Sequence, residues 1–325
     1  MGIQKQDRVA FRDISARGKD RKWRERKLKN IDLARRLEIL GYRSFERVYQ
    51  CSEVLKFLEQ EDGSRRLYQT YFCKNKLCPI CNWRRSMKYS FQAEKVVNEA
   101  IKRYPKGQFL FLTLTVRNVD AGELNSTISS MSKGFNKLFK YKKVSKNMLG
   151  YIRATEVTYN REENNYHPHF HILIFVKSTY FSRGNYLSQE EWTKKWQKAM
   201  VLDYSPIVDV RKVYSKGEDK NYKKVILEVS KYPIKPFDLE VDKKGNLLFY
   251  TEEEKLQITD DLMNGLFKKR QIGFGGLFKE LKKEFDLDDV EDGDLVNTSD
   301  DDGKSNKGKE IVAIWNWERK NYFLK

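Results

Sequence analysis

The chain has 325 residues, of which 39% are hydrophobic, so it can bury the core of one large domain or two modest ones. Its formal net charge of +18 favours a polyanionic partner, most commonly nucleic acid, because clustered Lys and Arg release counterions from a phosphate backbone. No apolar run is long enough to span a bilayer and the first residues lack a secretory signal, so we expect a cytoplasmic protein with no membrane partner.

Residues 1–50 are predicted to form a basic N-terminal arm. Between Arg17 and Lys29 eight of thirteen residues are basic, and Trp23 is the only aromatic one. This stretch cannot fold by apolar burial alone. A solvated helix face and an arm that binds the DNA backbone both agree with this composition, and the sequence does not decide between them.

All four cysteines lie in residues 51–104, which we predict to be a Cys-rich segment. Cys51 precedes a Cys73-x4-Cys78-x2-Cys81 cluster, a spacing close to that of a structural tetrahedral zinc site. Reduced, buried thiols are the alternative, whereas disulfides do not suit a cytoplasmic chain of this size. The residues directly after the last cysteine suggest a cationic and aromatic surface for DNA: Trp83, Arg84 and Arg85.

The middle of the chain carries the clearest periodicity. Leucines and a valine alternate with other residues over 108–116, which predicts a central strand. Apolar residues recur at helical spacing from Leu124 to Phe139 and predict a helix. Two further strands, at 150–159 and 167–176, are separated by a polar turn and are therefore predicted to form a hairpin.

Ser188 and Glu191 form a capping box that predicts the start of a second helix, and residues 205–214 predict a fourth strand. Residues 105–282 are thus predicted to form one domain with the order β-α-β-β-α-β. This is the order of a ferredoxin-like α+β fold, whose antiparallel sheet can carry a site on its open face. A further helix is predicted at about 221–232.

The last part of the chain contains an acidic stretch and then an apolar one. Ten residues between Glu284 and Asp302 are acidic and none is basic, so residues 283–306 are predicted to be a disordered or surface insertion. Without these ten charges the net charge would rise from +18 to +28. Residues 307–325 include the apolar segment IVAIWNW, which predicts a strand that returns to the folded part.

All three histidines lie in the strand predicted at 167–176, as His167, His169 and His171. Residues two apart on a strand share a face, so the three imidazoles point the same way. Glu156 on the preceding strand would come near them across the hairpin. Two imidazoles and a carboxylate suit Mn²⁺, and they tolerate Mg²⁺ when a substrate phosphate completes the ligand shell. The alternative is a polar strand edge that faces solvent.

These motifs resemble those of a known enzyme family. His169-Phe170-His171 resembles the signature of the HUH endonucleases, and HPHFHILIF is similar to the metal motif of their members that initiate plasmid rolling-circle replication. The LTLT strand at 112–115 and the segment FCKNKLCPICNWRR also resemble segments of these initiators. The resemblance implies that His169 and His171 are metal ligands, whereas His167 either binds the ion or orients a neighbour.

Residues 228–235, EVSKYPIK, resemble the third motif of this family, a tyrosine flanked by lysines with a glutamate one helical turn earlier. The resemblance implies that Tyr232 nicks one strand of the plasmid origin and leaves a 5′-phosphotyrosine and a free 3′-hydroxyl primer. Glu228 would then assist termination and rejoining. Lys231 and Lys235 would favour the phenolate form of the tyrosine.

The same resemblance implies single-stranded or hairpin origin DNA, a host helicase and a polymerase as partners, and it leaves a homodimer open. A relaxase or a transposase of the same superfamily is an alternative. However, a relaxase usually has its tyrosine before the histidines, and a single-tyrosine transposase is usually shorter. An alternative from another class is a zinc-dependent DNA-binding regulator that cuts nothing.

Overall fold

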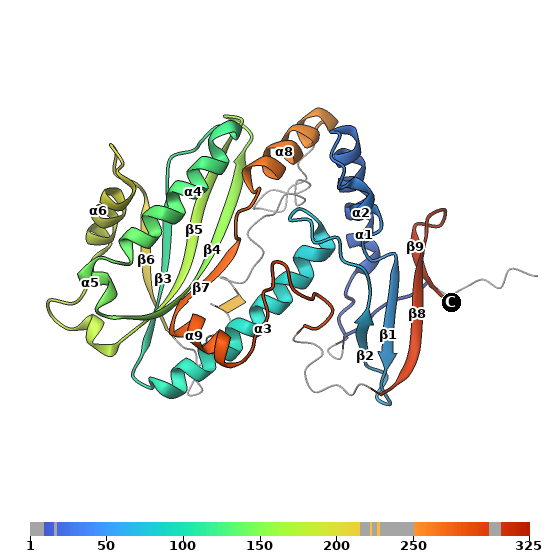
Figure 1. Cartoon of the computed structure of the whole chain (residues 1–325), viewed down its shortest axis with the longest axis horizontal. Coiled ribbons are helices and arrows are strands. Elements are labelled where there is room, and N and C mark those ends of the chain that lie inside the picture. The colour runs from blue at the N-terminus through green and yellow to red at the C-terminus, as the bar shows by residue number, and fades with distance from the viewer. Residues whose placement is uncertain (1–9, 16–17, 215–221, 223–225, 228–249, 299–306) are drawn as a thin grey trace, which may run out of the picture. The chain divides into compact units, whose positions relative to one another are not determined.

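The chain folds into two compact units (Figure 1). The cysteine unit comprises Met1–Lys88, Phe237–Thr259 and Asp292–Lys325, and the histidine unit comprises Tyr89–Pro236 and Asp260–Glu291. The computed structural model describes residues 10–15, 18–214, 222, 226–227, 250–298 and 307–325. Within these ranges, none of the helices has an apolar stretch of the length that a membrane requires.

The histidine unit is built on a five-stranded sheet in which every neighbouring pair of strands is antiparallel. In their spatial order the strands are β6 (Val208–Val213), β3 (Gln108–Thr115), β5 (Asn165–Val176), β4 (Met148–Asn160) and β7 (Ile272–Gly276). The helices are α4 (Ala121–Leu138), α5 (Lys142–Ser145), α6 (Gln189–Met200) and α9 (Leu277–Glu284), with the 3-10 helix η1 (Ser178–Phe181). Residues of both units contribute to α3 (Pro79–Arg103) and α8 (Glu252–Gly265).

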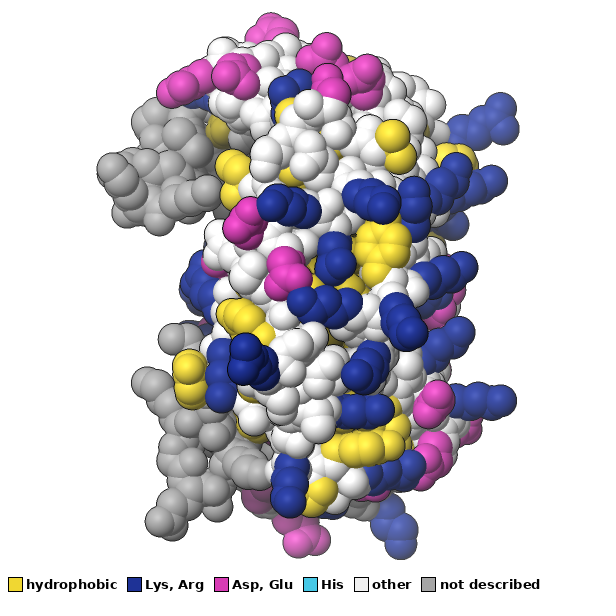
Figure 2. All heavy atoms as spheres, turned by 90° about the vertical axis from the view of Figure 1, so that its left-hand side faces the viewer, with side chains coloured by type: hydrophobic (Ala, Val, Ile, Leu, Met, Phe, Trp, Pro, Cys, Tyr) yellow, Lys and Arg dark blue, Asp and Glu magenta, His cyan; other side chains and the backbone are white. Residues whose placement is uncertain are grey.

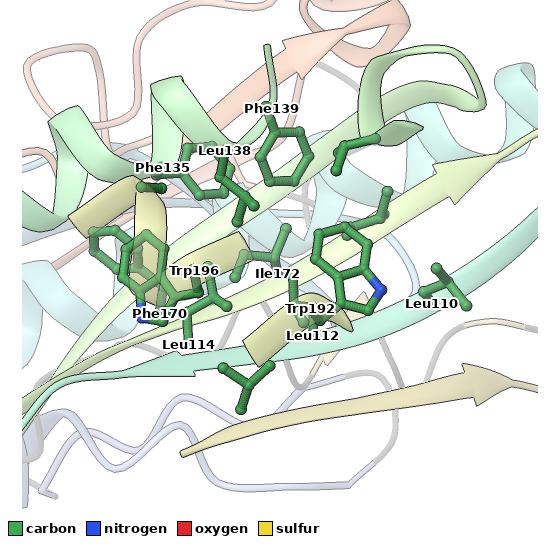
Figure 3. Close-up of a cluster of buried hydrophobic side chains, with 14 of the residues drawn as sticks. Leu110, Leu112, Leu114, Phe135, Leu138, Phe139, Phe170, Ile172, Trp192 and Trp196 are labelled. Carbon is green, nitrogen blue, oxygen red and sulfur yellow. The ribbon is translucent and has the colours of Figure 1, made fainter. Parts of the chain in front are cut away.

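One face of this sheet is buried beneath α4 and α6 (Figure 3). The alternating leucines of β3 lie opposite alternating apolar residues of β5, as in the pair Leu112 and Ile172, so both sets point to this face. Trp196 of α6 is fully buried there, and its Nε1 donates a hydrogen bond to the carbonyl oxygen of Thr115, 2.8 Å away. The histidines of β5 alternate with these apolar residues and therefore point to the opposite face.

The elements predicted from periodicity are confirmed. The strands β3, β4 and β5 agree within two residues with the predicted ones, and β4 and β5 pair as an antiparallel hairpin. The capping box of Ser188 and Glu191 is present and starts α6. The molecule is thus an α+β protein with antiparallel sheets, as predicted. Most of the helix predicted at about 221–232 lies outside the described residues.

The fifth strand, β7, has no counterpart in the sequence-based prediction, because its sequence IGFGG lacks the alternation of a strand. Its glycines allow the chain to approach β4 closely. A Cβ atom on Gly275 would lie 2.2 Å from the ring of Tyr151, whereas a Cβ atom on Gly273 would meet nothing within 4 Å. The pairing of β7 with β4 therefore leaves no space for a side chain at position 275 unless the ring of Tyr151 moves.

The cysteine unit contains a second antiparallel sheet and two helices. Its strands, in spatial order, are β2 (Arg65–Gln69), β1 (Val54–Glu59), β8 (Lys309–Asn316) and β9 (Asn321–Leu324). The helices are α1 (Trp23–Ile39) and α2 (Phe45–Tyr49). Most of the apolar segment IVAIWNW forms β8, which pairs with β1 and with β9. Segments far apart in the sequence thus form one sheet.

The helix α1 begins inside the basic stretch Arg17–Lys29. Trp23 is 3% exposed, and its Nε1 donates a hydrogen bond to a carboxylate oxygen of Asp13, 2.9 Å away. Lys27 is fully buried, whereas Lys19, Lys22 and other cations of the stretch are exposed. Buried anchors therefore fix the helix, while its exposed cations agree with both a solvated face and a DNA-binding arm.

Candidate metal centres

The hairpin of β4 and β5 brings a carboxylate next to the histidine strand. In the register of the two strands, Glu156 lies directly opposite His169, and His171 lies opposite Ala154. Directly opposed residues on antiparallel strands point to the same face. Glu156, His169 and His171 consequently share the face that α4 and α6 do not cover.

Three ligand atoms converge on this face. The Nε2 atom of His171 lies 2.9 Å from Oε2 of Glu156, and Nε2 of His169 lies 3.4 Å from the same oxygen. One ligand atom from each residue lies within 4.8 Å of the other two. Side chains in this arrangement can hold one metal ion without large rearrangement.

Neighbouring groups orient both imidazoles. Nδ1 of His169 lies 3.2 Å from the carbonyl oxygen of His167 and donates a hydrogen bond to it. Nδ1 of His171 lies 3.2 Å from the hydroxyl oxygen of Thr113, its partner across β3 and β5. When Nδ1 carries the proton, Nε2 has a free lone pair directed at the site. The carbonyl oxygen of His167 favours this tautomer of His169, whereas the hydroxyl group of Thr113 orients the ring of His171 and can either accept from Nδ1 or donate to it.

Burial and charge act in opposite directions on Glu156. Burial by itself would raise the pKa of this carboxyl group, but the hydrogen bonds and charges of His169 and His171 outweigh burial. The pKa of Glu156 is therefore held well below its ordinary value, and the group is a carboxylate at neutral pH. An anionic oxygen is the ligand that Mn²⁺ and Mg²⁺ prefer.

The three side chains remain partly accessible. The side chain of His169 is 11% exposed, and those of His171 and Glu156 are 24% and 26% exposed. A cation held by three protein ligands on such a surface keeps coordination positions for water or a phosphate oxygen. The donor set therefore fits a catalytic divalent cation better than a closed structural one.

His167 has a different position from the other two histidines. Its ring stacks on that of His169, with 5.1 Å between the ring centroids. Among the described residues, the converging group consists of Glu156, His169 and His171 and does not include His167. The backbone carbonyl of His167 orients His169, while direct binding of the ion by its imidazole stays a prediction.

The four cysteines come together in the cysteine unit. Cys51 follows α2, Cys73 and Cys78 lie in the loop between β2 and α3, and Cys81 lies in the first turn of α3. All four are free thiols with at most 5% exposure. One sulfur atom from each lies within 4.8 Å of the others.

The spacing of these sulfur atoms fits a tetrahedral zinc site. Sγ of Cys51 lies 3.7 Å from Sγ of both Cys78 and Cys81, and Sγ of Cys73 lies 3.6 Å from Sγ of Cys81. A tetrahedron with Zn–S bonds of about 2.3 Å has S–S edges of about 3.8 Å. Burial raises the pKa of the Cys81 thiol, whereas a bound cation would favour the thiolate. The cluster thus has the donor set of a structural zinc site.

Two residues of α1 donate hydrogen bonds next to this cluster. The Nζ atom of Lys27 donates to the carbonyl oxygens of Cys51, 2.8 Å away, and Tyr49. Nδ2 of Asn30 donates to Sγ of Cys78 at 3.4 Å. Both side chains are fully buried. The buried ammonium group of Lys27 interacts electrostatically with Cys51, Cys73 and Cys78, so it offsets the negative charge that thiolates would carry.

The guanidinium groups of Arg84 and Arg85 are buried, with 2% and 1% exposure. Nε of Arg84 donates a hydrogen bond to the carbonyl oxygen of Leu295 at 2.9 Å, and Arg85 donates to that of Lys74. Leu295 is itself buried and belongs to the stretch 283–306, whose residues up to 298 are described. These two guanidinium groups therefore connect segments within the cysteine unit.

Trp83 is only partly buried. Its ring contacts that of Trp23 edge-on, with 4.9 Å between centroids, and the guanidinium group of Arg26 lies 4.5 Å from its centroid. An aromatic ring flanked by a cation is a feature of surfaces that bind single-stranded nucleic acid. A DNA-binding role of Trp83, Arg84 and Arg85 stays a prediction.

Some site residues are missed by sequence reasoning, and others lie outside the described chain. Thr113 could have been found from the register, since the LTLT strand pairs with the histidine strand. No local pattern marks Lys27 or Asn30, because their burial depends on packing of α1 against distant cysteines. The residues predicted to carry the tyrosine chemistry lie outside the described residues: Glu228, Lys231, Tyr232 and Lys235.

Comparison with known proteins gives matches over nearly the whole chain. Residues 64–323 match the model of the Replication protein (Rep_1) family. A Protein rep of Streptococcus pneumoniae serotype 2 is 53% identical over 99% of this chain and 97% of its own length. A Protein rep of Lentilactobacillus hilgardii is 46% identical over 97% of this chain and 98% of its own. No solved structure matches the chain significantly.

Proposed function

Since this chain belongs to the Replication protein (Rep_1) family, we propose that it initiates rolling-circle replication of a plasmid by nicking one strand of the origin DNA. The observation that carries this proposal is the convergence of His169 and His171 on Glu156. Mn²⁺ or Mg²⁺ bound there would polarise the scissile phosphate. The names of the matched relatives agree with a role in replication.

The proposal assigns the histidine unit to the ferredoxin-like fold of the HUH endonucleases. The strand order β6-β3-β5-β4 and the position of α4 and α6 on one face support this assignment. The other face then presents Glu156, His169 and His171 to a DNA strand. Phe111, which lies on the same face and 5.6 Å from the ring of His171, offers an apolar surface to a nucleotide base.

In the proposed reaction, the phenolate oxygen of Tyr232 attacks the phosphorus atom of the scissile phosphodiester. A bond forms between this oxygen and phosphorus, and the bond from phosphorus to the 3′ oxygen breaks. The leaving oxygen takes up a proton and becomes the 3′-hydroxyl that a polymerase extends. The covalent 5′-phosphotyrosine conserves the bond energy that rejoining requires.

The residues near Tyr232 in the sequence have supporting roles in this proposal. Lys231 and Lys235 favour the phenolate through their positive charge. Glu228 acts as a base when the round ends, either for water or for a second strand transfer. The cysteine cluster holds a structural zinc ion, and Trp83 with its neighbouring arginines contributes to DNA binding. A host helicase and a polymerase act on the nicked DNA, and a homodimer is compatible with the scheme.

A nicking assay tests the proposal. Supercoiled plasmid that carries the cognate origin is incubated with the protein and Mn²⁺ or Mg²⁺, and Tyr232→Phe serves as the control variant. We expect relaxed circles and a covalent protein–DNA adduct for the wild type only. If Tyr232→Phe nicks at the normal rate, the assignment of the nucleophile is wrong.

The second candidate function is a zinc-dependent DNA-binding regulator that cuts nothing. The observation that favours it is the Cys cluster, whose closed and buried donor set is structural. It predicts origin binding without adduct formation under every metal condition. Metal analysis separates the two functions further, since a regulator of this kind would hold zinc at both the cysteines and the histidines.

A further inference from the structure

A lysine-rich pocket lies in the helical layer of the histidine unit. It has a volume of about 440 Å³ and is lined by residues at the start of α5 and along α6. One tyrosine, one glutamate and five lysines form its wall. The lysines are Lys142, Lys143, Lys194, Lys195 and Lys198. Like charges this close repel one another, so the pocket favours a polyanion.

The carboxylate in this pocket has a role in folding. Glu191 accepts a hydrogen bond from the backbone nitrogen of Ser188, 3.1 Å away, in the capping box of α6, and it also forms an ion pair with Lys143. Lys194 pairs with Glu190. The ammonium groups of Lys143 and Lys194 therefore already have carboxylate partners before any ligand binds.

Three cations in the pocket have no such partner. Within the described part of the chain, the ammonium groups of Lys142, Lys195 and Lys198 make no hydrogen bond or ion pair, and that of Lys195 lies 5.9 Å from the centroid of the Tyr141 ring. The hydroxyl group of Tyr141 is buried and has no hydrogen-bond partner among the described residues. The pocket thus has positive charge and hydrogen-bonding capacity that the fold itself uses only in part.

The pocket and the Glu156 site lie on opposite sides of the sheet. Trp192 and Trp196 of α6 are buried on the sheet face that α4 and α6 cover, while Lys194 and Lys198 are exposed on the outer side of the same helix. The histidines point to the opposite face of the sheet. A DNA strand at the metal site would therefore not reach this pocket directly.

The outer face of α5 and α6 is basic beyond the pocket itself. Figure 2 shows the side of the molecule on which α5 and α6 lie in Figure 1, and Lys and Arg side chains gather there. Lys140 and Lys146 flank α5 and are exposed. Basic side chains spread over such an area suit a long polyanion better than a small anion.

We propose that this pocket and the lysines around it bind the phosphate backbone of duplex DNA, at a second contact separate from the strand that is cut. The inference rests on the proposed function, because it assumes that the protein nicks origin DNA. It gives the duplex that flanks the nick a binding surface separate from the nicking site. Lysine ammonium groups on flexible stems bind phosphates as point charges and read no bases. The contact would hold the origin irrespective of its sequence.

Two features favour duplex DNA over other occupants. Lysine is depleted at the centres of protein interfaces, whereas here it makes up most of the lining, so an acidic protein surface fits less well. Single-stranded DNA is bound through exposed aromatic rings, but the aromatic residue of the lining, Tyr141, is partly buried.

The test uses the full chain with Lys142, Lys195 and Lys198 all changed to Gln. The control variant changes Lys106, Lys279 and Lys309 to Gln, which removes the same charge from three exposed residues on other segments. The probe is a short DNA duplex of arbitrary sequence, and its affinity is measured by fluorescence anisotropy over a range of salt concentrations. Thermal unfolding checks that both variants are folded.

We expect the pocket variant to bind the duplex more weakly than the control variant, with a salt slope lower by about 2 to 3, because three phosphate contacts are lost. Cleavage of a single-stranded oligonucleotide that contains the nick site should be unchanged. Equal affinities and slopes for the two variants would overturn the inference.

Poly-glutamate serves as a second probe. If the pocket variant binds poly-glutamate less well than the control variant but binds the duplex equally well, the occupant is an acidic protein and the inference is wrong. Failure of the proposed function can be distinguished from failure of this inference. A wild-type protein that binds duplex DNA but never nicks it contradicts the nicking chemistry and leaves the inference intact.

Discussion

His171 and Glu156 are joined across the β4–β5 hairpin by a 2.9 Å contact between Nε2 and Oε2. The same carboxylate oxygen lies 3.4 Å from Nε2 of His169. The backbone register alone brings the three residues together, since Glu156 and His169 are directly paired. Little conformational entropy is therefore lost when a cation binds, and small changes in the supporting residues should be measurable in metal affinity.

The hydroxyl group of Thr113 orients His171, so its removal should weaken metal binding. Thr113→Val keeps the shape of the side chain, and we expect the affinity for Mn²⁺ to fall by about 10-fold to 100-fold. Titration calorimetry or the electron paramagnetic resonance signal of free Mn²⁺ measures this change. Thr193→Val on α6, whose hydroxyl donates a hydrogen bond to the carbonyl oxygen of Gln189 in the same helix, is the matched control. Wild-type affinity in Thr113→Val would show that this hydroxyl does not matter.

The buried ammonium group of Lys27 should stabilise the zinc form of the cysteine cluster. Four thiolates and one Zn²⁺ carry two net negative charges, and a neighbouring cation in a buried place lowers their energy. We expect Lys27→Met to lose zinc about 10-fold to 100-fold more readily in competition with a chromogenic chelator. Lys19→Met, at an exposed position, should behave like the wild type. Equal zinc retention in all three proteins would contradict this role of Lys27.

The close approach of β7 to β4 predicts different results for two neighbouring glycines. Gly275→Ala places a methyl group 2.2 Å from the ring of Tyr151, so we expect a loss of about 1–3 kcal/mol in the free energy of unfolding. Gly273→Ala meets open space and should change it by much less. Urea denaturation of the two variants gives the comparison. A Gly275→Ala protein as stable as Gly273→Ala would mean that Tyr151 moves aside without cost.

Sequence periodicity was sufficient to predict that Glu156 lies near the histidines of the histidine strand. The alternation of His169 and His171 with apolar residues indicates one polar face, and the hairpin turn predicts that Glu156 comes near. These predictions depend on local backbone geometry, which a strand pattern specifies well. The hydrogen bond between Thr113 and His171 depends on the register with a third strand, which no local pattern gives.

Burial of charged residues is what the sequence did not predict. Arg84 and Lys27 belong to residue types that are usually exposed, and each is buried because backbone carbonyl oxygens accept its hydrogen bonds. Those oxygens come from residues distant in the sequence, so only the folded chain reveals them. The glycine strand β7 escaped prediction for a related reason, since contact with Tyr151 rather than its own alternation defines it.

The pairing of β1 with β8 has a consequence for the order in which the protein is made. Residues of β1 leave the ribosome early, but their partners at Lys309–Asn316 follow every residue of the histidine unit. The histidine unit can thus complete its sheet during translation, whereas β1 waits with an unpaired edge until β8 has been synthesised. Slow elongation through the last part of the message would prolong this interval and with it the exposure of the nascent chain to aggregation and proteolysis.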